Sequence, residues 1–117
     1  ETNGTITAQP EFDKRIDRYN CSPKTAMSGN DAYSVRLKDY SKTIYKYVVG
    51  TPEHCSEALK EIDRQKLPRE RCFFMILGTT AAEMEERGPA VAEICKREGI
   101  GLCIRIQSIL WNRRRGV

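Results

Sequence analysis

Two short segments of this chain carry side chains that could hold a small polar ligand. Ser22-Pro23-Lys24 joins a hydroxyl, a stiff backbone and an ammonium group, which together could hold a carboxylate or a ribose. Glu1 to Gly4 brings a carboxylate, a hydroxyl and an amide beside a glycine, which lets the backbone approach a ligand closely. Taken singly, each segment is also typical of an ordinary polar loop or turn.

Other site chemistries find little support in the residue types. No two of the five cysteines lie two or three residues apart, so the spacing typical of zinc or iron-sulfur ligands is missing. Cys72, Cys95 and Cys103 lie in apolar segments and are predicted to be buried thiols. The one histidine, His54, falls at a predicted helix start, where a surface position is expected rather than a catalytic triad.

The composition is that of an ordinary globular domain. With 39% hydrophobic and 31% charged residues, 117 positions suit one domain with a real core. No apolar run is long enough to span a membrane and no signal-peptide pattern opens the chain, so a cytoplasmic protein is expected. Much of the net charge of +4 sits at Arg113, Arg114 and Arg115, a tail typical of a solvated end.

The elements that must position the two segments are four strands alternating with three helices. Strands are expected over residues 16–21, 43–49, 72–77 and 101–111. Their apolar runs lack polar alternation, which favours strands covered on both faces.

The predicted helices begin and end at recognisable residues. The first is expected over residues 31–41, with Asn30 as its cap. The second begins at Thr51-Pro52, which supplies an N-cap and a first-turn proline. Three apolar residues would form its buried face: Ala58, Leu59 and Ile62.

The third predicted helix opens with a capping box. Thr80 and Glu83 have the required spacing, and Gly99 fits the left-handed residue that ends a helix. Gly88-Pro89 is predicted to kink or split this helix. Its buried stripe would consist of Val91, Ile94 and Cys95.

The alternation of strands and helices indicates an α/β fold with a parallel sheet and crossover helices. Four such strands would make a partial barrel or an open sheet with one unpaired edge, which further strands would have to cover. Ligands of such folds gather where the strands end, and both polar segments lie at predicted strand ends.

The ordered set of motifs resembles the 7-carboxy-7-deazaguanine synthases of the radical S-adenosylmethionine (SAM) superfamily. In that family one barrel strand ends in a segment like Glu1 to Thr5, and the next ends in one like Ser22 to Lys24 with a nearby Ser28-Gly29. A turn like Gly78-Thr79 follows a later strand, and a strand beginning at an arginine leads into a basic tail, here Arg105 to Val117. The resemblance covers the whole chain.

The resemblance implies the C-terminal half of a radical-SAM partial (β/α) barrel, with about four parallel strands and three crossover helices. It implies that residues 1–117 are the C-terminal portion of one core domain, without its cluster-binding N-terminal half. In this family a 4Fe-4S cluster reduces SAM, and the resulting radical drives the ring contraction of 6-carboxytetrahydropterin to 7-carboxy-7-deazaguanine for queuosine-type tRNA modification. Mg²⁺ assists this lyase reaction, and the enzymes are commonly homodimers.

Carried over residue by residue, the resemblance also implies a site. The implied SAM contacts are Thr2, Asn3, Ser22, Pro23, Lys24, Met75, Ile76, Leu77 and Gly78. Val117 would reach the substrate through the terminal carboxylate, as in some relatives. No catalytic residue and no metal ligand is expected within the chain.

The sequence departs from the family pattern at several places. Ile76-Leu77 stands where Pro-Glu is frequent, Gln107 where a histidine is frequent, and Asn112 where glycine is common. The cluster cysteines, a glycine-rich segment that holds the SAM amino group and a magnesium-binding threonine would all belong upstream of Glu1. The chain alone is therefore expected to be inactive and to need its other half or a dimer partner.

Two further readings remain open. One is a small non-catalytic α/β module that binds a nucleotide-like ligand or a partner. The other is an RNA-binding domain acting through Arg113 to Arg115, although no aromatic-rich basic stripe supports it.

Overall fold

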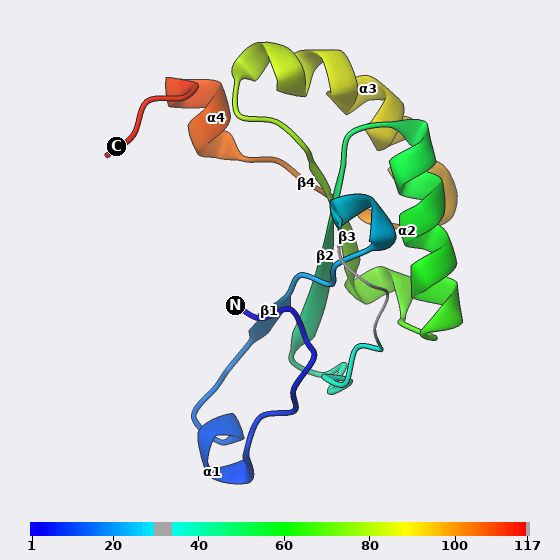
Figure 1. The fold of residues 1–117 in the computed structure, drawn as a ribbon, viewed down its shortest axis with the longest axis vertical. Helices are drawn as coiled ribbons and strands as arrows, with labels where there is room; N and C mark the ends of the chain where they lie inside the picture. Colours follow the sequence, from blue (N-terminus) through cyan, green and yellow to red (C-terminus); the bar gives the residue numbers. More distant parts are fainter. Residues whose placement is uncertain (30–33, 117) are drawn as a thin grey trace.

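The structure is a computed structural model that describes residues 1–29 and 34–116. Within these residues the centre is a parallel sheet of four strands in the order β1-β2-β3-β4, which confirms the predicted α/β class (Figure 1). In chain order the elements are α1 (Pro10–Asp13), β1 (Tyr19–Cys21), the 3-10 helix η1 (Ala26–Ser28), β2 (Thr43–Val49), α2 (Pro52–Arg64), the 3-10 helix η2 (Arg69–Arg71), β3 (Cys72–Ile76), α3 (Ala81–Glu98), β4 (Gly101–Cys103) and α4 (Ile106–Trp111).

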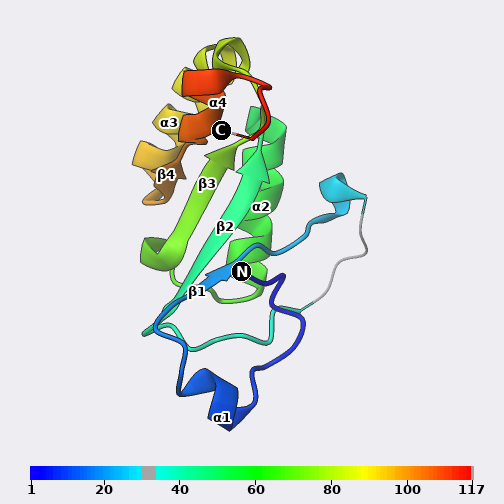
Figure 2. The ribbon, with the colours of Figure 1, turned by 90° about the vertical axis from the view of Figure 1, so that its left-hand side faces the viewer.

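The sheet has two different faces, because side chains alternate along each strand. One face packs against α2 and α3, and there Tyr45, Phe74 and Ile76 are at most 2% exposed. The other, which we call the open face, is turned toward the viewer in Figure 2. It carries half-buried and exposed side chains in two cross-strand rows, Lys46–Phe73–Gly101 and Val48–Met75–Cys103. The expectation that both faces are covered is therefore wrong for the described residues.

Helix α2 begins as its sequence predicts. The Thr51 hydroxyl accepts a hydrogen bond from the His54 amide at 3.2 Å, and Pro52 occupies the first turn. Ala58 and Ile62 are buried against the sheet, and Leu59 is half-buried beside them.

Helix α3 also has the predicted ends. The Thr80–Glu83 capping box is formed, and Gly99 ends the helix in the left-handed region at φ 68°. The helix nevertheless runs unbroken from Ala81 to Glu98, so the predicted split at Gly88-Pro89 is wrong. Proline removes one hydrogen bond, and the burial of neighbouring residues such as Val91 compensates for that loss.

The connection between β1 and β2 corrects another prediction. Of the helix expected over residues 31–41, positions 31–33 and the cap Asn30 lie outside the described residues, and the remainder is not helical. Val35 and Leu37 are buried while Ser34 and Arg36 are exposed, which is the alternation of an extended segment. The Arg36 amide donates to the Gly4 carbonyl at 2.8 Å, so this segment bonds to the chain start rather than to itself.

The first and last predicted strands are shorter than expected. β1 begins at Tyr19 rather than at residue 16. β4 ends at Cys103, where its pairing with β3 ends, and the rest of the apolar run forms α4. In that helix Ser108 is buried, whereas Ile106 and Leu110 are 61% and 60% exposed. The helix therefore has no buried apolar stripe, which is the sequence pattern that usually predicts a helix.

The cysteines differ in burial. Cys72 and Cys95 are buried as predicted, whereas Cys103 is only half-buried and lies on the open face, which corrects its expected burial. Cys21 and Cys55 are buried as well. Among the described residues no helix is long and apolar enough to cross a membrane.

Candidate functional site

A groove follows the carboxyl ends of the first three strands. It consists of three adjoining cavities of about 310, 60 and 220 Å³, all of which Val48 lines. The first cavity is lined by Glu1, Thr2, Asn3, Ser22, Lys24, Lys46, Val48, Met75 and Arg105. The second adds Pro23, Thr25, Met27, Tyr47 and Ala58, and the third adds His54 and Leu77. The groove therefore lies where ligands of parallel α/β sheets bind.

The first residues of the chain form one wall of this groove. The Thr2 amide donates to the Asn20 carbonyl at 3.0 Å, and the Ser22 amide donates to the Thr2 carbonyl at 2.7 Å. These bonds place residues 1–3 alongside β1 as a further parallel segment. The turn that follows needs glycine, because Gly4 has φ +80° and an added Cβ would lie 2.5 Å from the Cys21 sulfur.

One end of the groove is cationic. Lys46 projects from the middle of β2, and its ammonium lies 3.4 Å from the Glu1 carboxylate. Arg105 follows β4, and its Nε lies 3.5 Å from the Met75 sulfur. With Lys24, three cationic side chains and one carboxylate line the first cavity, an arrangement that favours an anionic group in the ligand.

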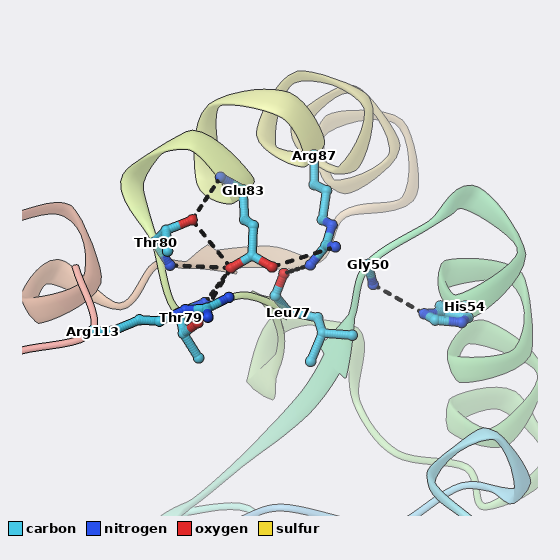
Figure 3. A network of polar contacts seen from close by, with 8 residues as sticks. All are labelled: Gly50, His54, Leu77, Thr79, Thr80, Glu83, Arg87 and Arg113. Carbon is cyan, nitrogen blue, oxygen red and sulfur yellow. Dashed lines mark hydrogen bonds and ion pairs between the residues drawn. The ribbon is translucent and has the colours of Figure 1, made fainter.

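The other end of the groove is mainly apolar. The third cavity is lined by Thr25, Met27, Val48, His54 and Leu77. The Gly50 amide donates to His54 Nδ1 at 3.1 Å, as Figure 3 shows, so the imidazole is tied to the end of β2. His54 is half-buried and lines the groove, so its expected surface position is partly covered.

The structure brings most of the predicted ligand contacts together. Seven of the nine line the groove: Thr2, Asn3, Ser22, Pro23, Lys24, Met75 and Leu77. The side chain of Ile76 instead lies in the core, and Gly78 packs against Met84 and Glu83 of α3. Val117 lies outside the described residues. Contact with a cofactor stays a prediction for all of these positions.

Sequence reasoning missed two cationic residues of the groove. Lys46 interrupts the otherwise apolar and aromatic run of residues 43–49, and a lysine at that point is a signal that the strand has one polar face. The strand predicted over residues 101–111 contains Arg105 in its interior, and only the early end of β4 places this residue at the groove.

The buried thiol of Cys21, which directly precedes the groove residue Ser22, is unreactive. Burial raises the pKa of Cys21 to about 11, although the nearby Lys24 opposes this shift. A thiol of this kind remains protonated near neutral pH and is a poor nucleophile or metal ligand. Among the described residues no group of three or more His, Cys, Asp or Glu side chains could hold a metal ion.

Comparisons with known proteins agree with the motifs. Neither a family model nor a solved structure matches the chain. A 7-carboxy-7-deazaguanine synthase from Pyrobaculum aerophilum is 27% identical over 117 residues, which covers 99% of this chain and 53% of that protein. The chain thus spans about half the length of this curated relative. The resemblance inferred from the motifs is confirmed: over nearly its whole length, the chain is similar to a 7-carboxy-7-deazaguanine synthase.

Proposed function

We propose that this chain forms the SAM-binding groove of a 7-carboxy-7-deazaguanine synthase. The observation that carries the proposal is that seven of nine contacts implied by the family line three adjoining cavities at the strand ends. The similarity to the Pyrobaculum protein over 99% of the chain supports the same conclusion independently of the geometry.

The chemistry of the groove fits SAM. The ligand has a carboxylate and an ammonium at one end and an adenine at the other. Lys24 and Lys46 would attract the carboxylate, while the hydroxyl of Ser22 and the amide of Asn3 would bind the ribose. The apolar end around Met27 and Leu77 would bury the adenine.

The cluster that this reaction needs would be held elsewhere. A 4Fe-4S cluster supplies the electron that activates SAM in this superfamily. The cysteines of the described residues are dispersed, and four of them are buried. We therefore infer that cluster and Mg²⁺ ligands come from a part of the enzyme outside these 117 residues, and that the chain alone binds SAM without turning it over.

The remaining partners are part of the same proposal. The carboxylate of 6-carboxytetrahydropterin would be attracted to the cationic end of the groove, near Arg105. A homodimer in the cytoplasm is the assembly that the family resemblance implies for the intact enzyme.

Binding by the chain itself tests the first step. We would measure the affinity for S-adenosylhomocysteine, a stable analogue with the same carboxylate, amine and adenosine, by calorimetry. Lys24→Ala is expected to weaken binding about 10-fold, because a charge-assisted contact is lost. Lys60→Ala, at an exposed position of α2 outside the groove, is the matched control and should bind normally.

Two outcomes would count against the proposal. A wild-type chain without measurable affinity for the analogue would remove the SAM groove. Equal weakening by Lys24→Ala and Lys60→Ala would show that only overall charge matters. If binding is confirmed, the full-length enzyme with a reconstituted cluster should convert 6-carboxytetrahydropterin, and failure there would favour a non-catalytic binding module.

A further inference from the structure

The loop that follows β3 is held by helix α3 from one side. It comprises residues 77–80 and carries Leu77, which lines the apolar end of the groove. The Glu83 carboxylate accepts hydrogen bonds from the amides of Thr79 at 2.7 Å and Thr80 at 3.1 Å (Figure 3). Arg87 lies beside Glu83 and donates to the Leu77 carbonyl. Hydrogen bonding to the carboxylate lowers the pKa of Glu83, so these contacts persist well below neutral pH.

The segment that follows α4 contacts this loop at Thr79 and contacts the first residue of α3, Ala81. Asn112 follows α4, and its side-chain oxygen accepts a hydrogen bond from the amide of Ala81 at 2.9 Å. Ala81 is the first residue of α3, where backbone amides have no partner within the helix. Arg113 Nε donates to the Thr79 hydroxyl at 3.2 Å, as Figure 3 shows. Segments more than 30 residues apart in sequence thus meet at this loop.

The backbone of Asn112 makes this contact informative. Its φ of 51° and ψ of −125° lie in a region that favours glycine. A glycine would meet the backbone requirement without strain, but it would leave the Ala81 amide without this acceptor. The asparagine therefore combines an unfavourable backbone conformation with a side-chain contact to the loop region.

We propose that Asn112 and Arg113 are positioning residues that hold the loop after β3 in the shape the ligand groove requires. They act through their hydrogen bonds to Ala81 and Thr79. Glu83 and Arg87 bind the same loop from α3. A loop held in its bound shape costs less to order when a ligand binds. We call the contacts of Asn112 with Ala81 and of Arg113 with Thr79 the clamp. The inference rests on the proposed function for the identity of the ligand, but not for the existence of the clamp.

Three substitutions and one control test the two contacts separately. Asn112→Gly removes the acceptor while keeping the backbone conformation, so the variant should fold. Asn112→Asp keeps an acceptor oxygen at the same place. Arg113→Ala removes the second contact, and Arg114→Ala is the matched control because its side chain makes neither contact to the loop.

Two readouts separate the clamp from the proposed function. The first is amide hydrogen exchange at residues 79–81, which should become faster in Asn112→Gly and Arg113→Ala and stay unchanged in Arg114→Ala. The second is affinity for S-adenosylhomocysteine, which should fall about 2- to 10-fold, the range that one hydrogen bond contributes. Asn112→Asp should restore both values.

Hydrogen exchange and ligand affinity together decide between the possible outcomes. Unchanged exchange in Asn112→Gly and Arg113→Ala overturns the proposal. Faster exchange with unchanged ligand affinity also overturns it, because the clamp would then position nothing that the ligand needs. A wild-type chain that does not bind the analogue overturns the proposed function instead, and the clamp is then judged on exchange and on its rescue by Asn112→Asp.

Discussion

The two faces of the sheet use the same strands for different purposes. The face toward α2 and α3 is filled by large apolar side chains such as Tyr45 and Phe74, each with 0% exposure. On the open face the neighbouring residues Lys46 and Met75 remain half-buried and line the groove. Because side chains alternate along a strand, one short sequence can stabilise the fold with every second residue and shape a site with the others.

The largest expected effect tests whether stability resides on the core face. Phe74→Ala should reduce the free energy of unfolding by about 3–5 kcal/mol, because it empties a fully buried position. Met75→Ala, one residue further on the open face, should cost about 1 kcal/mol or less because its surroundings are partly solvent already. Urea denaturation of both variants gives the comparison, and equal losses would contradict it.

A second variant tests the packing of the open face. Gly101 pairs with Phe73, and a Cβ on Gly101 would lie 2.4 Å from the Phe73 ring. Gly101→Ala should therefore destabilise the chain by about 1–3 kcal/mol, the cost of overpacking. In a double-mutant cycle, adding Phe73→Ala should abolish most of the extra cost. Additive losses would show that the ring is not what excludes a side chain here.

Lys46 should matter for binding more than for folding. Replacement by methionine keeps the length of the side chain and removes the charge. Its ion pair with the 69% exposed Glu1 should contribute less than about 1 kcal/mol to stability, because exposed pairs are weak. Affinity for S-adenosylhomocysteine should fall about 10-fold in Lys46→Met. If Lys46→Met lowers the free energy of unfolding by more than it lowers the free energy of binding, Lys46 matters mainly for folding.

The buried thiols predict a pH dependence of the free energy of unfolding. Burial raises the pKa of Cys21 and of Cys55 from 9.0 to about 11, so folding favours the protonated thiols. Their contribution to stability is complete below pH 9.0 and is lost as the pH rises toward 11, because the unfolded chain releases these protons first. Denaturation midpoints should therefore decline between these values. In the native protein at neutral pH, Cys103 should react with a thiol reagent well before Cys21.

Short sequence motifs correctly predicted helix caps and one strand, because these depend on residues that lie close together in the chain. Thr51-Pro52, the Thr80–Glu83 box and Gly99 set the ends of α2 and α3 as expected, because each cap depends on residues within one turn. The strand 43–49 was also located correctly from its β-branched and aromatic residues. The failures lie where partners distant in sequence decide the conformation, as in the segment after residue 33 that bonds to Gly4 and Gln65.

The candidate site shows the same division. Ser22-Pro23-Lys24 and Glu1 to Asn3 could be named from residue types and family resemblance, since each is one continuous segment. That Lys46, His54 and Arg105 join them depends on strand register and on where β4 ends, which no single segment specifies. The resemblance carried over Met75 to Gly78 as one continuous stretch and so included Ile76, whose side chain the structure places in the core.

The sequence by itself determined the fold class, the start of α2, both ends of α3 and the resemblance to a synthase, because these depend on local propensities and on ordered motifs. Only the tertiary structure decided which residues meet: the groove gathers side chains from segments following several strands, and the loop after β3 is held by residues more than 30 positions away. The physical reason is that pairing and packing between distant segments depend on register and shape, which short-range sequence patterns do not encode.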